Sequence, residues 1–556
     1  MPTVRFMEEI LLNKPGKKII LLGNEAIVRG ALESGVNFVS TYPGTPASEI
    51  GNIFFRIAKN AGVYFEFSTN EKVALEVAAG ASFSGLKSLV AMKSFGLNVA
   101  SDSLIPLCYT GVEGGMVILV ADDPGCWSSA QSEQNSRPYS YLAHIPTLEP
   151  SDSQECKDFT KLAFQISERF KIPVMIRTTT RVAHQRMPVT LSKILNLKSQ
   201  NQKPKFIKKP ERFSTMPPRV FEMKKELLEK IEKIQVFSEN SPINQISRGR
   251  TSAKLGVISS GISYLYVMEA LKELNLNLPV LKLGFFYPLP EKKIQDFIKS
   301  FKKVLIIEEL EPYLEKEVER LAKDVNPKLQ IFGKNLIPEI GELKPETVTS
   351  AIAQFTDTKY LIPNTKYNIP IPKRLPRLCP GCPYWLVVEA VKKAINEKDV
   401  IFGGEIGCYM LFRNPPINLQ DYLSCMGSSV GIAHGIKKAT NQKIITFVGD
   451  SSFFHAGIPA LINTVFNKSN PLIIILDNRT TAMTGHQPHP GAPATPDGIK
   501  IEDIIQSLGI KNFKVIDPIN QEEFTTTVKE FLEKDEVSVI IARRPCIFVA
   551  EKYVKK

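Results

Sequence analysis

The chain has 556 residues, too many for one hydrophobic core, so its length alone predicts several domains. Apolar residues make up 43% and charged residues 23%, as in ordinary soluble globular proteins. The net charge is +13, but the basic residues are spread along the chain, so we do not expect nucleic acid as a partner. No apolar run is long enough to cross a membrane, and the first residues lack the apolar core of a signal peptide. We therefore expect a cytoplasmic protein without membrane association.

Residues 1–190 alternate short apolar runs with segments of helical periodicity. The runs KKIILLG, GMVILVADD and KIPVMIRTTTR are typical of buried strands, and NEKVALEVAAGASFSG is typical of a helix with small residues for close packing. Alternation of this kind predicts an α/β domain with a doubly wound parallel sheet.

Two connectors and two further α/β domains follow. Residues 191–250 are basic and carry prolines before a charged helix, and we interpret them as a linker. Residues 251–345 form a smaller α/β domain, and residues 346–373 form a second connector. Residues 374–556 are again α/β, with strands predicted at KIITFV, PLIIILD and VSVIIARR.

An aspartate follows directly on one of these strands, in the sequence FVGDSSFFHAG. This residue is Asp450, and the next strand along the chain ends in Asp477 and Asn478. Open parallel sheets bind ligands at the carboxyl ends of their strands. Carboxylate and amide oxygens suit Mg²⁺, and the amides at a helix start suit phosphate. An aspartate here can also be a helix N-cap, but the two strand ends together favour a magnesium-bridged diphosphate.

The same segment resembles the thiamine diphosphate-binding motif, and further motifs extend the resemblance over nearly the whole chain. They are STYPGTPASEI, NEKVALEVAAGAS, MKSFGLNVASD, ADDPGCWSSAQSEQNSR, LGVISSGISYLYVMEAL, CPGCP, GEIGCYML and CMGSSVGIAHG. In this order they resemble the alpha subunits of indolepyruvate ferredoxin oxidoreductases, within the 2-oxoacid:ferredoxin oxidoreductase superfamily. The resemblance implies a pyrimidine-binding domain at 1–190, a transketolase-C-terminal-like domain at 251–345 and a diphosphate-binding domain at 374–556.

The resemblance implies thiamine diphosphate and Mg²⁺ as cofactors. Asp450, the Asn478 side chain and the Thr480 carbonyl would bind the Mg²⁺. The other residues implied at the cofactor are Gly407, Cys408, Gly449, Ser451, His455 and His486.

One protein carboxyl group must activate the aminopyrimidine ring, a task that suits a glutamate in a low-dielectric site. The segment NEKVALEVAAGAS carries Glu71 and Glu76, which point about 140° apart on a helix, so only one of them can face the cofactor. Glu76 precedes the small-residue run VAAGAS, and the resemblance also favours it. We therefore assign the role to Glu76, with Glu71 as the alternative.

The loop YPGTP, residues 42–46, resembles the family's loop that meets the 2-oxo acid, with Thr45 as a hydrogen-bond donor. Arg137 resembles the arginine that binds the substrate carboxylate, a task for which a bidentate guanidinium is suited; a surface salt bridge is its alternative role. Relatives that act on pyruvate carry a bulky residue where this chain has Gly44. The volume left at Gly44 predicts a preference for aryl 2-oxo acids.

Four of the eight cysteines match positions at which the superfamily holds the [4Fe–4S] cluster nearest to the thiamine. They are Cys379, Cys382, Cys408 and Cys546. Four thiolates from three loops are what such a cluster requires. Zinc and four free thiols remain open, because a CxxC pair alone equally suits zinc.

The implied activity is the oxidative decarboxylation of a 2-oxo acid such as indolepyruvate to the acyl-CoA, with electrons passed to ferredoxin. The alternatives are a non-oxidative decarboxylase that releases an aldehyde and an inactive assembly subunit. The family implies a homodimer of this chain joined by a smaller beta subunit, α2β2. The usual alpha subunit continues into a ferredoxin-like domain, whereas this chain stops at CIFVAEKYVKK. We therefore expect an external one-electron acceptor.

Overall fold

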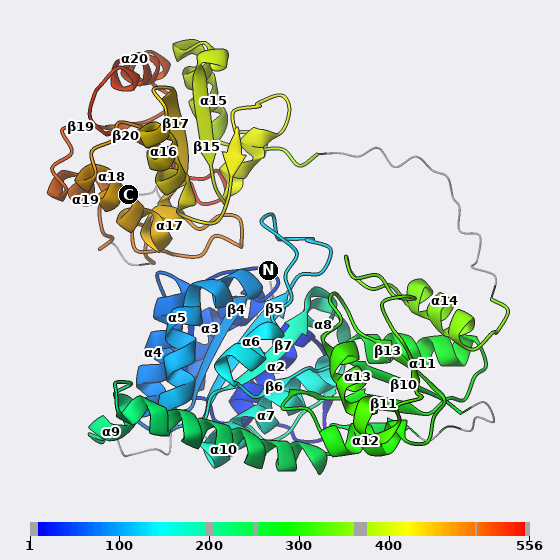
Figure 1. The fold of residues 1–556 in the computed structure, drawn as a ribbon. Coiled ribbons are helices and arrows are strands. Elements are labelled where there is room, and N and C mark those ends of the chain that lie inside the picture. The colour runs from blue at the N-terminus through cyan, green and yellow to red at the C-terminus, as the bar shows by residue number, and fades with distance from the viewer. Residues whose placement is uncertain are drawn as a thin grey trace. The chain divides into compact units, whose positions relative to one another are not determined.

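The computed structural model describes residues 9–195, 205–247, 249, 254–360, 375–494 and 497–550. The chain forms two compact units, residues 1–366 (unit 1) and 367–556 (unit 2), each built on parallel-rich β-sheet (Figure 1). The α/β fold predicted from the sequence is confirmed. Among the described residues, no helix has the length and apolar character needed to span a membrane.

The main sheet of unit 1 has seven strands in the order β12-β6-β7-β5-β4-β2-β3. They are β2 (Phe38–Thr41), β3 (Tyr64–Phe67), β4 (Ser88–Lys93), β5 (Met116–Asp122), β6 (Thr147–Leu148), β7 (Val174–Thr179) and β12 (Phe285–Tyr287). All neighbours are parallel except β12, which is antiparallel to β6. Strands β5 and β7 are buried along their whole length, which explains the apolar sequence of β5 up to Asp122 and of the first half of β7.

The helices of this region follow the strands in alternation. They are α2 (Gly23–Glu33), α3 (Ser48–Ala61), α4 (Glu71–Phe83), α5 (Ser94–Thr110), α6 (Pro138–Ala143), α7 (Ser153–Phe170) and α8 (Thr180–His184). Helix α4 begins after Asn70, whose side chain accepts a hydrogen bond from the Val73 backbone N–H as an N-cap. Helix α5 follows β4 without a loop, so Lys93 is both the last residue of the strand and the N-cap of the helix.

The first predicted strand forms, but outside the parallel sheet. Strand β1 (Lys18–Leu22) pairs antiparallel with β8 (Arg186–Thr190) in a separate two-stranded sheet. Its residues alternate between buried and exposed, and Ile20 is 66% exposed. A strand with one solvated face belongs in a small antiparallel sheet, because helices cover both faces of a parallel one.

A second sheet of unit 1 has the order β14-β13-β10-β11-β9 and is parallel except at β9. Its strands are β9 (Gln245–Ser247), β10 (Leu255–Ser260), β11 (Val280–Leu283), β13 (Lys303–Ile307) and β14 (Gln330–Phe332). Its helices are α11 (Ser263–Glu273), α12 (Glu291–Ile298), α13 (Tyr313–Val325) and α14 (Pro345–Phe355). Strand β12 lies between these elements in the chain but pairs with β6, which ties the two sheets together.

The region interpreted as a linker contains α9 (Pro210–Phe213) and the long helix α10 (Arg219–Glu239), which runs along the outside of unit 1 (Figure 1). The side chains of Met223, Leu227, Ile231 and Ile234 are buried at helical spacing, so α10 packs through one apolar stripe. Residues 196–204 of the first connector and 361–373 of the second lie outside the described residues.

Unit 2 has one fully parallel sheet of six strands in the order β16-β15-β17-β18-β20-β19. The strands are β15 (Val400–Gly404), β16 (Tyr422–Leu423), β17 (Lys443–Gly449), β18 (Leu472–Asp477), β19 (Asn512–Ile516) and β20 (Ser538–Arg543). The helices are α15 (Tyr384–Ala394), α16 (Ser428–Ala439), α17 (Asp450–Ser452), α18 (Ile458–Phe466), α19 (Ile501–Ser507) and α20 (Gln521–Leu532), with the turns η2 (Glu397–Asp399), η3 (Cys408–Arg413) and η4 (Phe453–Gly457).

Each parallel sheet has a point where the strand order reverses. In unit 1 the chain passes from β2 to β3 on one side and then to β4 on the other. In unit 2 it passes from β15 to β16 and then to β17. Connections leave in opposite directions there, so the carboxyl ends of β2 and β4, and those of β15 and β17, are where ligand binding is expected.

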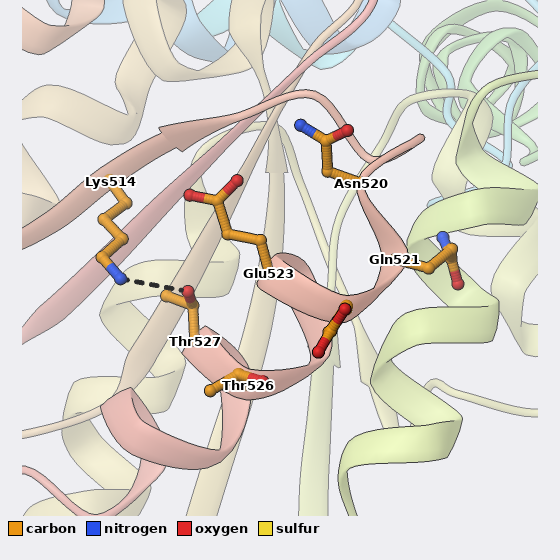
Figure 2. Close-up of a pocket in the computed structure, with 7 residues that line it drawn as sticks. Lys514, Asn520, Gln521, Glu523, Thr526 and Thr527 are labelled. Carbon is orange, nitrogen blue, oxygen red and sulfur yellow. Dashed lines mark hydrogen bonds between the residues drawn. The ribbon is translucent and has the colours of Figure 1, made fainter.

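A shallow hollow of about 510 Å³ lies elsewhere, beside β19 and the start of α20 (Figure 2). Its lining residues are Lys514, Asn520, Gln521, Glu522, Glu523, Thr526 and Thr527. Lys514 Nζ donates to Thr527 Oγ1 at 3.4 Å. The hollow holds none of the residues that the sequence places at a site, and it is remote from the reversal point of the strand order.

Candidate functional site

The structure brings together the two strand ends that the sequence singled out in unit 2. Strand β17 ends at Gly449, and Asp450 begins the short helix α17. Strand β18 runs parallel beside it and ends at Asp477, followed by Asn478. The side chains of Asp450, Asp477 and Asn478 are all buried. They lie at the edge where the strand order reverses, the usual ligand-binding edge of such sheets.

The Asp450 carboxylate is held by three donors. Its Oδ1 accepts from the Ser451 backbone N–H at 2.8 Å, and its Oδ2 accepts from the Arg479 backbone N–H at 2.8 Å. His489 Nε2 lies 3.0 Å from Oδ2. The Gly491 N–H donates to His489 Nδ1 at 3.2 Å, so Nε2 carries the proton and donates to Asp450. The sequence analysis missed His489, because it lies far from Asp450 in the chain.

A second carboxylate stands beside Asp450. Burial and the negative charge of Asp450 raise the pKa of Asp477 to about 6, and Arg543 opposes the rise through a hydrogen bond from Nε at 2.7 Å. Two buried carboxylates side by side repel each other, and a cation between or near them relieves the repulsion. The edge is therefore suited to a positively charged ligand.

Asn478 links this edge to the cysteines. Its side-chain Oδ1 accepts from the Thr480 backbone N–H at 3.1 Å, and its carbonyl oxygen accepts from the Cys546 backbone N–H at 2.9 Å. Thr481 Oγ1 donates to Ser451 Oγ at 2.9 Å, which ties this loop to the start of α17. The loop after β18 thus touches both the Asp450 turn and the segment after β20.

A buried Tyr–Glu pair contacts the end of strand β17. Tyr409 Oη donates to Glu405 Oε1 at 2.5 Å and accepts from the Gly449 N–H at 2.8 Å. The Tyr409 ring packs against two of the glycines expected at the cofactor, where any side chain would clash with it. A Cβ at Gly407 would lie 2.3 Å from the ring, and one at Gly449 would lie 2.9 Å from it. Burial raises the pKa of Glu405 to about 8, although Tyr409 and backbone donors act to lower it.

The four cysteines expected at a cluster line one pocket of about 260 Å³. They come from the turn before α15, the start of η3 and the segment after β20: Cys379, Cys382, Cys408 and Cys546. Leu378, Leu411, Ile547 and Phe548 supply apolar lining. Burial raises the pKa of the Cys408 thiol to about 12 and that of Cys382 to about 11. Within the described ranges, no three His, Cys, Asp or Glu side chains converge closely enough to hold a single metal ion.

Two of the histidines lie near this edge. His455 is buried in η4, the turn that follows α17. His486 lines the cysteine pocket, and its ring stacks on Phe548 with 5.6 Å between ring centroids. Both positions agree with residues at the cofactor end of unit 2, although a role there stays a prediction.

In unit 1 the geometry reverses the choice between the two glutamates. The Glu76 side chain is 45% exposed, pairs with Lys72 and accepts from Ser103 Oγ at 2.6 Å. Burial acts to raise its pKa, but the hydrogen bonds from Lys72 and Ser103 lower it. Activation of a ring nitrogen needs the opposite shift, because the glutamate must share a proton. Glu76 is therefore poorly placed for the role that the sequence analysis gave it.

Glu71 is buried more deeply than Glu76. It is the first residue of α4 and only 5% exposed. A Cβ added at Gly96 of α5 would lie 2.6 Å from Glu71 Cγ and 2.8 Å from its Oε1. Gly96 thus leaves room for the Glu71 carboxyl group between the two helices. The small residue that matters stands across from the glutamate in space, and not after it in the sequence.

The space at Gly44 is already filled. A Cβ at Gly44 would lie 2.9 Å from both Cγ and Cδ of Lys93. The glycine therefore accommodates the lysine stem, and the argument that its missing side chain leaves room for an aryl substrate was wrong. Thr45, next in the loop, is half-buried, and its Oγ1 lies 3.3 Å from Ser48 Oγ.

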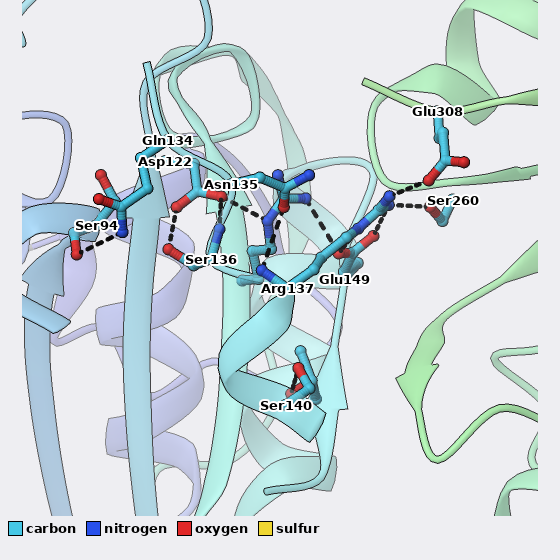
Figure 3. Close-up of polar contacts among 12 residues, drawn as sticks. Ser94, Asp122, Gln134, Asn135, Ser136, Arg137, Ser140, Glu149, Ser260 and Glu308 are labelled. Carbon is cyan, nitrogen blue, oxygen red and sulfur yellow. Dashed lines mark hydrogen bonds and ion pairs between the residues drawn. The ribbon is translucent and has the colours of Figure 1, made fainter. Parts of the chain in front are cut away.

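Arg137 does not face a substrate, because its guanidinium is part of a buried network (Figure 3). Its Nε and Nη2 each donate to Glu149 at 2.7 Å, Nη1 pairs with Glu308, and Nη2 also donates to Ser260 at 2.7 Å. Burial alone would raise the pKa of Glu149, but Arg137 and Arg177 lower it to about 2. These contacts tie the main sheet of unit 1 to the sheet that carries Ser260 and Glu308. Its expected role at the substrate is therefore corrected to a structural one.

Three family models match successive parts of the chain. The thiamine diphosphate-binding family of pyruvate flavodoxin/ferredoxin oxidoreductases matches residues 29–240, and the indolepyruvate oxidoreductase domain matches residues 245–357. The C-terminal binding domain of thiamine pyrophosphate enzymes matches residues 405–542.

Curated relatives match almost the whole chain. Indolepyruvate oxidoreductase subunit IorA of Methanothermobacter thermautotrophicus is 46% identical over 97% of this chain and 89% of its own length. The chain belongs to the IorA family. The same subunit of Pyrococcus horikoshii is 42% identical over 98% of this chain and 88% of its own length. Among solved structures, 2-oxoglutarate:ferredoxin oxidoreductase from Magnetococcus marinus aligns with a TM-score of 0.49 and 17% identity, over 61% of this chain and 65% of that one.

Family membership agrees with the resemblance found in the sequence motifs, which is thereby confirmed. The matched models describe thiamine-binding families at both α/β ends of this IorA-family chain.

The Arg137 network predicts a large stability loss for Arg137→Met, since Glu149 and Glu308 would stay buried without their main partner. Breaking a buried pair in this way costs about 3–5 kcal/mol of unfolding free energy. The matched control is Arg320→Met, because Arg320 pairs with Glu291 and Glu317 while 50% exposed, and such pairs contribute at most about 1 kcal/mol. Urea unfolding followed by circular dichroism measures both. A stable Arg137→Met protein with a raised KM would restore the substrate role.

The raised pKa of Glu405 predicts that the unfolding free energy of unit 2 falls as pH rises. Its pKa is about 8 in the fold and about 4.3 in an unfolded chain, so only the folded form holds the proton between these values. Stability should then fall by up to about 1.4 kcal/mol per pH unit across that range, and Glu405→Gln should flatten the dependence. Trp385 fluorescence in a Trp127→Phe background reports on unit 2, because the chain has 2 tryptophans. The exposed Glu389→Gln variant is the control, and an unchanged slope in Glu405→Gln would contradict the assignment.

Proposed function

We propose that this chain is the thiamine diphosphate-binding catalytic subunit of an oxidoreductase that oxidatively decarboxylates an aryl 2-oxo acid such as indolepyruvate. The observation that carries the proposal is the pair of buried strand ends at Asp450 and Asn478, on the reversal edge of an IorA-family chain. The curated relatives, named as indolepyruvate oxidoreductase subunits, support the substrate class. The corrected Gly44 argument no longer contributes to it.

Asp450, the Asn478 side chain and the Thr480 carbonyl would bind Mg²⁺, and Gly449 and Ser451 would flank the diphosphate. The donor set fits this cation, because a carboxylate and two neutral oxygens gather beside a second carboxylate whose charge favours a cation. When bound, thiamine diphosphate supplies a nucleophilic carbon and a sink for the electrons left by decarboxylation. His489 would orient the Asp450 carboxylate through its Nε2–H, as second partners of metal ligands commonly do.

Glu71 would share a proton with the aminopyrimidine ring. Burial beside Gly96 keeps water from the carboxyl group, and a carboxyl group shielded in this way can hold or release a proton at a ring nitrogen. Thr45 remains a candidate donor to the 2-oxo acid, on the loop that follows β2. Arg137 is not part of this proposal.

Cys379, Cys382, Cys408 and Cys546 would hold a [4Fe–4S] cluster. Four thiols from three segments share one largely apolar pocket, which matches the ligand set of such clusters. Thiolate ligands bound to iron avoid the cost that burial imposes on free thiolates. The cluster would pass electrons singly to ferredoxin or to a cluster on a partner subunit, with CoA accepting the acyl group.

The relatives are named as subunits, which supports a partner chain. We propose a smaller beta subunit and a homodimer of this chain, α2β2, as in the family that the motifs resemble. A non-oxidative decarboxylase is the second candidate, and the iron content of the protein separates the two.

The first test compares Glu71→Gln with Glu76→Gln in the assembled enzyme. We expect Glu71→Gln to retain thiamine diphosphate but to lose about 10²- to 10⁴-fold in turnover of indolepyruvate, the usual worth of a positioned acid or base. Glu76→Gln should stay within a few-fold of wild type, because its carboxylate is tied to Lys72 and Ser103 at the surface. Bound cofactor is measured by fluorescence after oxidation, and the reverse ranking of the two variants would return the role to Glu76.

The second test measures metal, sulfide and aldehyde after anaerobic purification. We expect about four iron atoms per chain, reduced sharply by Cys408→Ser. Cys425→Ser is the matched control, because Cys425 is exposed and does not line the pocket. If the protein instead contains one zinc ion per chain, the four cysteines form a zinc site and hold no cluster. Thiamine without iron, together with aldehyde released from an aryl 2-oxo acid, would favour the decarboxylase.

A further inference from the structure

Lys93 occupies the reversal point of the main sheet of unit 1. It ends β4, next to β2 and its YPGTP loop, at the edge where open parallel sheets bind ligands. Its stem runs against Gly44, which has no side chain to displace it. The backbone of the loop and the lysine therefore fit each other, and Lys93 is fixed at this edge of the sheet.

The Lys93 ammonium has no direct counter-charge. Within the described parts of the chain, its Nζ makes no hydrogen bond and no ion pair, and it lies 4.6 Å from the Phe95 ring centroid. Lys93 itself is half-buried, and two lysines that are buried more deeply both have a carboxylate partner: Lys157 pairs with Glu33, and Lys282 pairs with Glu155. A partly desolvated ammonium without a paired carboxylate can accept an anion as its partner.

The position of Lys93 at the start of helix α5 adds to the positive electrostatic potential around its ammonium. It is the N-cap of α5, where the helix dipole disfavours cations and favours anions. Burial lowers the pKa of Lys93, whereas Asp123, Glu71 and Cys126 act to raise it without touching it. Under the proposed function Glu71 shares a proton with the cofactor ring, so it does not neutralise the lysine.

We propose that Lys93 binds the carboxylate of the 2-oxo acid substrate, the task first expected of Arg137. This inference rests on the proposed function, because that function supplies the anion and places Glu71 at the cofactor. The Lys93 Nζ would act as a point donor to one carboxylate oxygen, with the α5 N-terminus adding positive potential.

The test uses ligands that bind without reacting, so that it does not depend on turnover. Indole-3-acetate carries the carboxylate, and indole-3-acetamide replaces it with a neutral group of the same shape. In the assembled wild-type enzyme, we expect the acetate to bind about 10- to 100-fold more tightly than the acetamide, as for a charge-assisted hydrogen bond. Lys93→Met keeps the stem against Gly44 and should remove that preference, whereas Lys93→Arg should keep part of it.

Steady-state kinetics gives the second readout. Lys93→Met should raise KM for indolepyruvate about 10- to 100-fold with kcat within a few-fold of wild type. The matched control is Lys87→Met, which changes the lysine before the opposite end of β4, where it pairs with Glu168. A fall in kcat with KM unchanged would mean that Lys93 acts on Glu71, and an unchanged preference between acetate and acetamide would mean that it only packs; either outcome overturns the proposal.

The pH dependence of wild-type binding covers the case in which Lys93→Met does not fold. The preference for acetate should be complete near neutral pH, where the carboxylate is ionised and the lysine charged, and be lost as pH rises through the lowered pKa of Lys93. A preference that stays constant over that range overturns the proposal. Wild-type enzyme that prefers acetate but turns over no 2-oxo acid would instead refute the proposed function and leave the anion site intact.

Discussion

Parallel strand pairing is the constraint on which both candidate sites depend. Every strand of a parallel sheet ends at the same edge. Residues from distant parts of the chain therefore meet at that edge, and the backbone pairing of the strands alone brings them together. Ligands commonly bind at this edge where the strand order reverses, as it does between β2 and β4 in unit 1 and between β15 and β17 in unit 2. Elsewhere the connecting helices cover it. The loops with the most unusual chemistry, YPGTP and GDSS, stand at these two points.

Close-approach glycines convert these edges into sites. Gly96 gives space to the Glu71 carboxyl group, Gly44 gives space to the Lys93 stem, and Gly449 gives space to the Tyr409 ring. In each case a large side chain lies directly on backbone from another segment, which no residue with a Cβ would allow. The same principle explains why the Gly44 argument failed. A missing side chain leaves volume for whichever group comes nearest in the fold, and that group was a lysine from the neighbouring strand.

Features that depend on consecutive residues could be predicted from the sequence, whereas features that depend on contacts between distant residues could not. Apolar periodicity and the Gly-Asp-Ser and Asp-Asn strand ends sufficed for the α/β class and for the edge at Asp450, because both are written in consecutive residues. Strand β1 was placed in the wrong sheet, since its pairing with β8 joins residues 164 to 172 positions apart, from Leu22 with Arg186 to Lys18 with Thr190. Helix geometry showed that only one of Glu71 and Glu76 could be buried, but which one depends on α5 packing against α4. The roles of His489 and Tyr409 were missed for the same reason, since each depends on contacts with residues far away in the chain.

Charge pairing separates structure from function among the buried groups. Four of the five N–H donors of the Arg137 guanidinium bond to Glu149, Glu308 and Ser260, so this side chain is committed to the network. Such complete networks hold sheets together and cost a great deal to break. Other groups lack such a partner: two buried carboxylates lie at Asp450 and Asp477, four thiols line one pocket, and the half-buried Lys93 ammonium has no paired carboxylate. A folded chain keeps such imbalances only where something else supplies the missing charge. Under the proposed function, a divalent cation, an iron–sulfur cluster and a substrate carboxylate would be the respective partners of these three groups.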